Sequence, residues 1–567
     1  MSKFLNEPAK AVTVALDALL LVTPGLERLS GTNVIVRSDI QSNEVALVCG
    51  GGSGHEPAHA GFVGDGLLTA AVCGDVFASP PHAAIIATLQ HISTKSPKGI
   101  LVIVKNYGGD LINFGYAVKW AKAQGIEAEM IVVDDDVTFG IHNDARRGIA
   151  GTVAFYKALG AAARVGYNLK ELVALGNHLR LNLRSMGCSL SSCSVPGSTC
   201  ADPIPQGQME VGLGIHGEKG EIRMEQLPVT DIVEKLLDKI IKGEKTSDRW
   251  PNGTHVAMMV NNLGSTTDIE MGVIFHTALA QLREFYGLQV DLVSCGRFMT
   301  ALEMHGFSIT LVHLHPSKSG SDVKTFLENH HPKIAFVEPP MKPKYHEVPK
   351  RQAPQTSETA DPSGEWLKHI IKAVLLHVKA QAERYNTLDS VVGDGDTGHG
   401  VARAATAALD VIDSLPFSTQ LSDSVVFLAE VIAEAFAGTS GPLYGAMLMA
   451  GAKKLKNNAA ENTAEDFVAA LTAGTAAVAE LGGAAYGDRT MFDVLHDVTS
   501  AATSNVGKAP KEIAVSLAEV AKQRSQEVAQ LTAKKGRARY LAGKEIGNLD
   551  PGCELVVDWL NAVAEQL

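Results

Sequence analysis

The stretch that decides the N-terminal fold is VALVCGGGSGHEP, residues 45–57. A short aliphatic run, Val45–Cys49, leads into a dense group of glycines and then into His55. Short Val-rich runs bounded by glycine are typical of buried strands. Residues that follow a strand of a parallel sheet lie at the edge where ligands bind. The stretch therefore predicts a strand followed by a loop whose glycines let the backbone approach a small ligand.

Similar runs alternate with helical stretches through the N-terminal part, which predicts an α/β fold with a mostly parallel sheet. Expected helices include Ala83–His91 and Phe114–Gln124. The further expected strands are Ile100–Val104, Glu129–Val133, Val256–Val260, Val290–Ser294 and Ile309–Leu314.

The composition changes near residue 350. The stretch Glu347–Glu365 holds three prolines and no aliphatic cluster, so we expect domains at residues 1–346 and 364–567 with a linker at 347–363. The C-terminal part is rich in alanine, with apolar residues at spacings of three and four, which predicts helices and no strand. The eight expected helices are Glu365–Tyr385, His399–Ser414, Asp423–Phe436, Leu443–Lys456, Ala464–Leu481, Met491–Thr503, Ile513–Leu531 and Gly552–Gln566.

Composition excludes several classes of protein. Of 567 residues 46% are hydrophobic, which favours a globular protein, and the net charge of −12 makes nucleic acid a poor partner. The seven cysteines are irregularly spaced with no Cys-x-x-Cys, which argues against a disulfide framework and indicates a reducing compartment. Glu7 and Asp17 argue against a signal peptide around Ala11–Val22, and no apolar stretch is long enough to span a membrane.

Three short pattern matches lack the required context. His55-Glu56-Pro57-Ala58-His59 fits a zinc-protease pattern, but Pro57 and the preceding glycines keep the histidines from sharing a helix face. The G-x-G-x-x-G matches at 212–217 and 393–398 are not flanked by a strong strand and a helix, so a dinucleotide site is not expected.

An acidic cluster at Asp389, Asp394 and Asp396 has the spacing of carboxylates that converge on Mg²⁺, although a solvated loop with helix caps fits equally well. Glycine-rich segments at 438–442, 487–490 and 550–552 precede helices. Each could present backbone amides to a phosphate, or could be a simple cap or turn. In the N-terminal part, Lys105 and Asp110 suit a small polar substrate, whereas a lone histidine such as His216 is more often structural than catalytic.

Longer segments, in the same order along the chain, resemble the ATP-dependent dihydroxyacetone kinases that fuse a K and an L domain, a family that includes the triokinase/FMN cyclases. The segments are GGGSGHEPAHAGFVG at 50–64, IVKNYGGDLINFG at 103–115, VGLGIHGEKG at 211–220, LDSVVGDGDTGHG at 388–400, GTSGPLYG at 438–445, GDRTMFD at 487–493 and GNLDPG at 547–552. The resemblance implies two α/β subdomains in the K domain, an eight-helix barrel in the L domain, and a cytoplasmic homodimer.

The resemblance also implies roles in the K domain. His216 corresponds to a histidine that adds to the substrate carbonyl and forms a hemiaminal. Asp110 accepts the proton of the substrate hydroxyl, assisted by His55. The implied substrate-binding residues are Gly52, Ser53, Gly54, His55, Lys105 and Asp110.

In the L domain, the resemblance implies that Asp389, Asp394 and Asp396 hold two Mg²⁺ ions on the phosphates of ATP. The implied ATP-binding residues are Asp394, Gly395, Asp396, Thr397, Thr439, Ser440, Gly482, Thr490, Met491, Asp550, Pro551 and Gly552.

The expected activity is phosphorylation of dihydroxyacetone by ATP. The alternatives are a C4 ketose such as erythrulose or glyceraldehyde as the substrate, cyclisation of FAD to cyclic FMN in the L domain, and a non-catalytic ligand sensor. The chain departs from the family pattern at Gly108, where threonine is usual, at Thr439, and in the basic stretch Lys534–Arg539. Gly108 lies beside the substrate loop and leaves the preferred ketose open.

Overall fold

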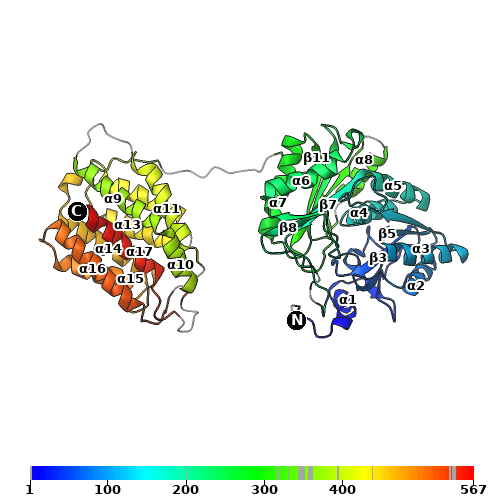
Figure 1. Ribbon diagram of the computed structural model, residues 1–567, viewed down its shortest axis with the longest axis horizontal. Coiled ribbons are helices and arrows are strands. Elements are labelled where there is room, and N and C mark those ends of the chain that lie inside the picture. Colours follow the sequence, from blue (N-terminus) through cyan, green and yellow to red (C-terminus); the bar gives the residue numbers. More distant parts are fainter. Residues whose placement is uncertain are drawn as a thin grey trace. The chain divides into compact units, whose positions relative to one another are not determined.

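The computed structural model describes residues 3–198, 200, 202–315, 318–329, 331–341, 352–354, 362–392, 395–436, 439–535, 538 and 545–567. The chain forms two compact units, Met1–Lys344 and Tyr345–Leu567, which Figure 1 shows as an α/β unit and a helical unit. This architecture confirms the expected fold class. Most of the expected linker, 347–363, lies outside the described residues.

The first sheet of the N-terminal unit has the order β1-β2-β4-β3-β5-β6. Its central strands β4, β3, β5 and β6 are parallel, whereas β1 and β2 pair antiparallel. The strands are β1 (Leu26–Arg28), β2 (Val34–Arg37), β3 (Ala46–Ser53), β4 (Ala70–Val76), β5 (Ile100–Lys105) and β6 (Ala128–Val133).

Helices cover both faces of this sheet. Val48 of β3 packs in one core with residues of α2 (His82–Ser93) and α3 (Gly108–Ala123). Its neighbour Leu47 packs in the other core, with α4 and α5. Because successive side chains of a strand point to opposite faces, a strand covered on both sides is apolar throughout. This explains the uninterrupted run at the start of β3. Helices α4 and α5 span Thr152–Arg164 and Leu169–Asn182.

The second sheet has the order β11-β10-β12-β7-β8-β9, and only β10 and β11 are parallel. The expectation of a mostly parallel sheet is therefore wrong here. Strands β7, β8 and β9 follow one another without an intervening helix, and parallel neighbours need such a crossover. The strands are β7 (Leu183–Ser189), β8 (Gln208–Val211), β9 (Ile222–Glu225), β10 (His255–Asn262), β11 (Gln289–Gly296) and β12 (Gly306–His313).

The remaining helices of this unit complete its layers. Helices α6 (Val229–Lys242) and α7 (Asp268–Ala280) pack on the second sheet in a core that includes Leu236 and Ile309. The other α-helices are α1 (Ala11–Val22) and α8 (Lys318–Glu328). All six strands expected from the sequence are present.

The glycine run lies inside strand β3 and not in a loop after it, which corrects the sequence interpretation. A Cβ atom on Gly50 would stand 2.2 Å from the carbonyl oxygen of Val72 on β4. The close approach of the neighbouring strand therefore requires glycine at position 50. The loop begins only after Ser53.

The C-terminal unit is helical, and its described residues contain no strand. The helices are α9 (Pro362–Ala380), α10 (Ala382–Val392), α11 (Thr397–Ile412), α12 (Leu421–Ala435), α13 (Ser440–Ala452), α14 (Ala464–Gly482), α15 (Met491–Ser504), α16 (Pro510–Val528) and α17 (Pro551–Gln566).

Each helix from α11 to α16 packs on the next, α17 packs on α9 and α9 packs on α11, so these helices form a closed ring. The first expected helix, Glu365–Tyr385, is divided at Gln381 into α9 and α10, and Gly398 of α11 packs against the carbonyl of Ala382 at this break. The helices line a partly open apolar cavity of about 400 Å³, whose walls include Leu428 and Trp559.

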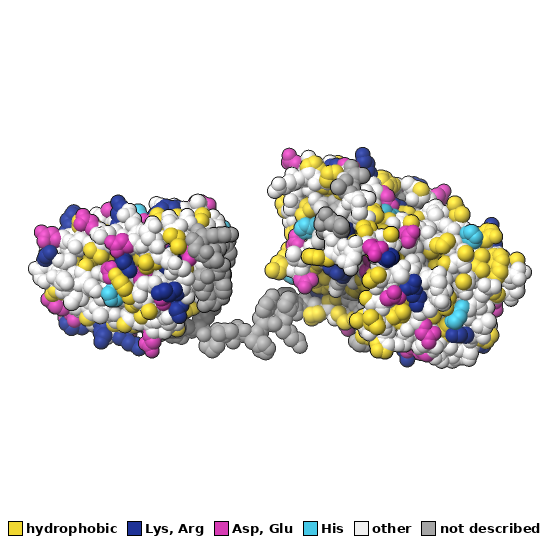
Figure 2. All heavy atoms as spheres, turned by 90° about the horizontal axis from the view of Figure 1, so that it is seen from below, with side chains coloured by type: hydrophobic (Ala, Val, Ile, Leu, Met, Phe, Trp, Pro, Cys, Tyr) yellow, Lys and Arg dark blue, Asp and Glu magenta, His cyan; other side chains and the backbone are white. Residues whose placement is uncertain are grey.

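The surface and the cysteines agree with the composition. Acidic and basic side chains are interspersed on the face shown in Figure 2. All seven cysteines are free thiols. Among the described residues, no helix has the length and apolar character needed to cross a bilayer.

We expect the two units to fold independently, because each has its own hydrophobic core. Fragments 1–344 and 345–567, expressed separately, should each show cooperative thermal unfolding by far-UV circular dichroism. A fragment that lacks a cooperative transition while the full chain has one would contradict this division.

Candidate functional site

A buried ion pair lies at the carboxyl end of the first sheet. Lys105, the last residue of β5, is fully buried, and its Nζ lies 3.2 Å from Oδ2 of Asp110. Asp110 lies in the first turn of α3, where the helix dipole stabilises a negative charge. Its Oδ1 accepts a hydrogen bond from the hydroxyl of Ser79. Asp110 is therefore held as an oriented carboxylate.

The glycines of β3 make room for this pair. A Cβ atom on Gly51 would lie 2.3 Å from Nζ of Lys105, and the φ of Gly51 is +148°. A Cβ atom on Gly52 would lie 2.8 Å from Cα of Phe77. The hydroxyl of Ser53 donates to the carbonyl of Gly74 over 2.7 Å. Gly51 and Gly52 are thus closely approached by the protein's own groups.

Two histidines face each other beside the ion pair. The rings of His55 and His216 have centroids 4.9 Å apart, and Tyr107 and Phe77 pack edge-on to His216 at 4.6 and 5.1 Å. His216 is 19% exposed, whereas His55 is fully buried. Residues from the segment after β3, the β4–α2 connection, the β5–α3 connection and the 212–217 loop therefore lie side by side.

Hydrogen bonds indicate the tautomer of each histidine. Nδ1 of His216 lies 2.8 Å from Oε1 of Glu218, and Nδ1 of His55 lies 2.8 Å from the carbonyl oxygen of Thr300. Both partners are acceptors, so both Nδ1 atoms carry the proton and both Nε2 atoms keep their lone pairs. Nε2 of His55 is buried and has no hydrogen-bond partner among the described residues.

The electrostatics keep His55 neutral. Burial, followed by the positive potential of His216 and Lys105, lowers the pKa of His55 well below its usual value. Burial alone would raise the pKa of Glu218, but its bonds to His216 and to backbone amides outweigh this effect and hold the pKa at about 2. The pocket thus contains a neutral imidazole next to a carboxylate-bound imidazole.

Arg147 fixes the loop that carries His216. Its guanidinium donates to the carbonyl of Gly212 over 2.6 Å and to Asp136 over 2.7 Å. A Cβ atom on Gly214 would lie 1.9 Å from Oε2 of Glu218, so the loop is closely packed.

The second sheet closes the pocket. The amide of Leu302 donates to the carbonyl of Gly54 over 2.8 Å, and the amide of Thr300 donates to the carbonyl of His55 over 3.1 Å. These bonds link the β11–β12 connection to the segment after β3. The pocket therefore depends on both sheets of the N-terminal unit.

The structure brings together the expected substrate residues Gly52, Gly54, His55, Lys105 and Asp110 with the expected nucleophile His216. The sequence reasoning missed four polar contributors. Glu218 lies within the quoted segment at 211–220, whereas the partner of Ser79, Asp110, is distant in sequence. The missed residues are His59, Ser79, Glu218 and Thr300.

In the C-terminal unit, Asp389 connects two helices. Asp389 is a buried residue of α10. Its carboxylate accepts hydrogen bonds from the backbone amides of Asp396 and Thr397, at the start of α11, over 3.0 and 3.2 Å. The carboxylate of Asp396 is exposed and has no hydrogen-bond partner within the described part of the chain. Asp394 lies outside the described residues. Gly395 has a φ of +79°.

The other expected ATP residues lie at helix ends. Thr490 caps α15, and Asp550 caps α17 by accepting from the amide of Cys553 over 3.0 Å. A Cβ atom on Gly552 would lie 3.6 Å from Cβ of Met491, so these two helix starts are neighbours. Such starts present free backbone N–H groups, which suit phosphate oxygens. Thr439 and Ser440 lie at the start of α13, and Gly482 at the end of α14.

Arg489, in the segment 487–490 that the sequence indicated as a possible phosphate site, is a buried cation to which the sequence reasoning gave no binding role. Its Nη2 donates to the carbonyls of Glu545 and Asn548 at 3.0 and 2.8 Å, and its Nη1 lies 3.9 Å from Oδ2 of Asp550. Nε and Nη1 have no hydrogen-bond partner within the described part. Burial raises the pKa of Asp550, although the amide of Cys553 and the charge of Arg489 oppose this. These guanidinium donors can serve an anion.

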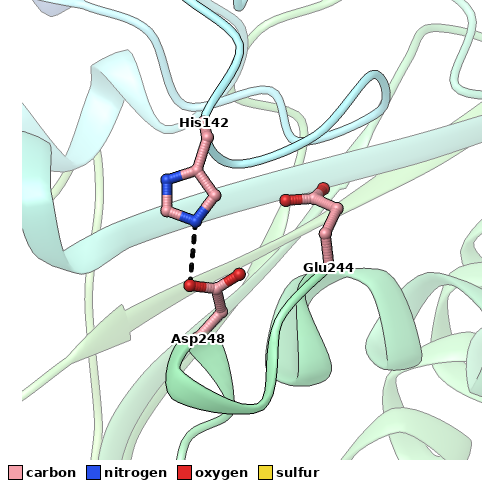
Figure 3. Close-up of side chains that lie close together, drawn as sticks. All are labelled: His142, Glu244 and Asp248. Carbon is pink, nitrogen blue, oxygen red and sulfur yellow. Dashed lines mark hydrogen bonds and ion pairs between the residues drawn. The ribbon is translucent and has the colours of Figure 1, made fainter.

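A separate cluster of His142, Glu244 and Asp248 has ligand atoms within 4.8 Å of one another (Figure 3). Nε2 of His142 lies 2.9 Å from Oδ1 of Asp248, and Glu244 accepts from the amide of Ile141 over 3.0 Å. These bonds fasten the 138–147 loop to the end of α6 and account for the cluster without an ion.

Comparison with known proteins agrees with this two-unit arrangement. Residues 17–331 match the Dak1 domain and residues 391–565 match the DAK2 domain. The triokinase/FMN cyclase of Mus musculus is 35% identical over 577 residues, which cover 100% of this chain and 98% of that protein. The dihydroxyacetone kinase of Citrobacter freundii is 33% identical over 574 residues, or 99% of each chain. The crystal structure of that enzyme with AMP-PNP and Mg²⁺ superimposes on this chain with a TM-score of 0.65. The sequence identity is 30%, and the match covers 100% of both chains.

A Dak1 unit with a buried polar pocket, followed by a helical DAK2 unit, defines the fused two-domain class of phosphotransferase. The chain belongs to the dihydroxyacetone kinase and triokinase family. The resemblance stated from the sequence motifs is therefore confirmed.

The packing of Gly51 gives a test of the pocket. Gly51→Ala should destabilise the N-terminal unit by about 1–3 kcal/mol, because the new Cβ would displace Lys105 and the positive φ is strained. Gly108→Ala is the matched control, since its Cβ would meet nothing within 4 Å and its effect should stay within about 1 kcal/mol of the parent. Urea unfolding measures both, and equal stability of the two variants would contradict the packing argument.

Proposed function

We propose that the chain transfers the γ-phosphoryl group of ATP to a hydroxyl of a short ketose, with dihydroxyacetone as the preferred substrate. The observation that carries this proposal is the pocket in which His216, neutral His55 and the Lys105–Asp110 pair converge. Family membership supports the same reaction class. The name of the C. freundii relative supports the choice of dihydroxyacetone.

His216 binds the ketose covalently in this proposal. Its Nε2 lone pair attacks the carbonyl carbon, the C–N bond forms, and the π bond of the carbonyl breaks. The carbonyl oxygen gains a proton and the imidazole loses its Nδ1 proton, so the adduct is a neutral hemiaminal. Glu218, 2.8 Å from Nδ1, orients the ring for this attack. Polyols lack a carbonyl and cannot form the adduct.

Asp110 then acts as the general base. Its carboxylate accepts the proton of the substrate hydroxyl as that oxygen attacks phosphorus. Lys105 and Ser79 hold the two carboxylate oxygens in place. Nε2 of His55, a buried acceptor without a partner among the described residues, accepts a hydrogen bond from the substrate.

ATP binds the DAK2 unit in this proposal. Asp389, Asp394 and Asp396 hold two Mg²⁺ ions, which would neutralise charge on the transferring phosphoryl group. The exposed carboxylate of Asp396 fits a hard cation, because its oxygens have no partner within the described part. The starts of α13, α15 and α17 supply backbone amides, and Arg489 adds a nearby cation.

A second activity has one specific observation in its favour. The mouse relative that matches the whole chain is a triokinase/FMN cyclase. Cyclisation of FAD to cyclic FMN would use the metal site of the DAK2 unit and would not need His216. Glyceraldehyde and C4 ketoses remain alternative phosphoryl acceptors, because Gly108 leaves open space at the start of α3.

The decisive experiment for the kinase reaction compares the parent protein with His216→Ala. Turnover of ATP should be measured with dihydroxyacetone, erythrulose, glyceraldehyde and glycerol. We expect phosphorylation of dihydroxyacetone, very little of glycerol, and loss of ketose turnover in His216→Ala with unchanged ATP binding. Intact-mass analysis should detect a ketose adduct in the parent alone. Comparable turnover of glycerol would overturn the hemiaminal mechanism.

The metal site is tested by Asp396→Asn. The variant should lose several kcal/mol of transition-state stabilisation, about 10²- to 10⁴-fold in kcat, because a Mg²⁺ ligand loses its charge. Asp413→Asn, at the other end of α11, is the control and should retain activity. Ketose binding, measured by calorimetry, should be the same in both variants. A loss of ketose binding in Asp396→Asn would contradict the assignment of Asp396 to the ATP site.

A further inference from the structure

We propose that His59 is a positioning residue that orients Lys105, and through it Asp110, by accepting a hydrogen bond at Nε2. This inference deepens the proposed ketose kinase reaction and rests on it. His59 lies at the second histidine of HEPAH, for which the sequence reasoning found no role, and it is only 2% exposed.

The ammonium of Lys105 has three hydrogen atoms and three acceptors. They are Oδ2 of Asp110 at 3.2 Å, Nε2 of His59 at 3.1 Å and the carbonyl oxygen of Gly50 at 3.5 Å. An ammonium only donates, so Nε2 of His59 is the acceptor in this contact. Since Lys105 is fully buried, water cannot replace a lost acceptor. The direction of the Lys105 side chain is thus fixed by three protein groups.

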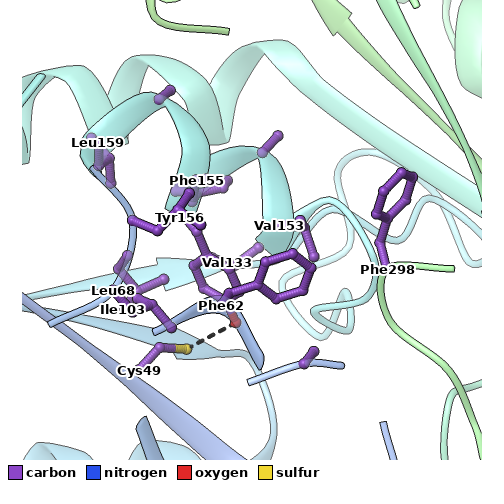
Figure 4. Packing of buried hydrophobic residues seen from close by; sticks show 14 of the residues in the cluster. Cys49, Phe62, Leu68, Ile103, Val133, Val153, Phe155, Tyr156, Leu159 and Phe298 are labelled. Carbon is purple, nitrogen blue, oxygen red and sulfur yellow. Dashed lines mark hydrogen bonds between the residues drawn. The ribbon is translucent and has the colours of Figure 1, made fainter. Parts of the chain in front are cut away.

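The contact with Lys105 determines the other side of the imidazole. With Nε2 as acceptor, Nδ1 carries the proton and donates to the hydroxyl of Tyr156 on α4. That hydroxyl also lies 3.2 Å from Sγ of Cys49, a contact that Figure 4 shows. Hydrogen bonds therefore connect Lys105 through His59 and Tyr156 to Cys49. This chain leaves a single tautomer for His59.

Apart from Lys105, the hydrogen-bonded groups of this row, His59, Tyr156 and Cys49, are kept uncharged by their surroundings. Burial and the charge of Lys105 lower the pKa of His59 well below its usual value. Burial raises the pKa of Cys49 to about 11 and that of Tyr156 well above its usual value. A neutral His59 does not repel the ammonium, so the positive charge remains directed at Asp110. The titratable groups around His59 are those of its own hydrogen-bonded row and three neighbours. They are Lys105, Tyr156 and Cys49 in the row, and His55, Cys73 and Asp110 beside it.

Two amide variants separate this role from simple packing. A glutamine at position 59 can place its oxygen where Nε2 lies, whereas the shorter asparagine reaches only the position of Nδ1. We expect His59→Asn to lower kcat/KM for the ketose on the order of 10- to 100-fold, the range for a buried charged donor that loses a partner. The loss should fall mainly on kcat. His59→Gln should restore most of the activity.

The separate values of kcat and KM provide a readout that a packing defect would not move in this way. In His59→Asn the KM for the ketose should stay near the parent value while kcat falls, because the ammonium that orients Asp110 loses an acceptor. His59→Gln should keep both values near the parent. Tyr156→Phe is a second control: it removes a buried hydroxyl that contacts His59, but Sγ of Cys49, 3.6 Å from Nδ1, can still accept the proton of His59. Its kcat and KM should also match the parent.

The outcomes are distinguishable. A parent protein that phosphorylates no ketose would overturn the proposed function itself. A parent that does so, with the asparagine and glutamine variants equally impaired or with kcat unchanged in both, would overturn the role of His59. Thermal unfolding of each variant should be recorded alongside, and the difference in kcat between the two variants at matched stability decides the question.

Discussion

The N-terminal unit depends on one constraint, which is that the ammonium of Lys105 is completely removed from water. Removing an ion from water costs several kcal/mol unless its hydrogen bonds and charge are matched within the protein. The surrounding residues meet this requirement: Asp110 supplies the opposite charge, His59 and Gly50 supply acceptors, and Gly51 supplies the space. The end of β3, the start of α3 and the first residues after β3 are arranged around this ammonium.

Much of the fold could be predicted from periodicity. The apolar runs of the first sheet are uninterrupted because helices cover both faces, and the alternation with helical stretches identified its parallel core. The second sheet was harder to predict, because β8 and β9 are short and carry polar residues such as Glu210, whose burial is balanced by an ion pair with Arg223. A search for apolar runs in the sequence does not detect a strand that is stabilised by an ion pair. The break between α9 and α10 was missed because Gln381 is an ordinary helix residue.

The grouping of residues at the candidate site was predictable where a motif contained the residue, as for His55, Asp110 and His216, whose roles in the reaction are those proposed above. It was not predictable where a residue acts through a distant partner. Glu218 matters because its carboxylate meets the ring of His216, and Thr300 because its carbonyl meets His55. Such pairings depend on the path of the chain in space. Arg489 was given no role for the same reason, since its partners lie more than 50 residues further along.

The contrast between Gly51 and Gly108 bears on how this protein can diverge. Every substitution at position 51 adds an atom where Nζ of Lys105 already lies, so a lineage that keeps the ion pair keeps this glycine. At position 108 a new Cβ atom meets no atom within 4 Å, although it stands at the first turn of the helix that carries Asp110. Inherited variation can therefore accumulate at one end of the pocket while the chemistry at the other end stays fixed. Under the proposed function, substrate preference can therefore drift without the loss of the reaction.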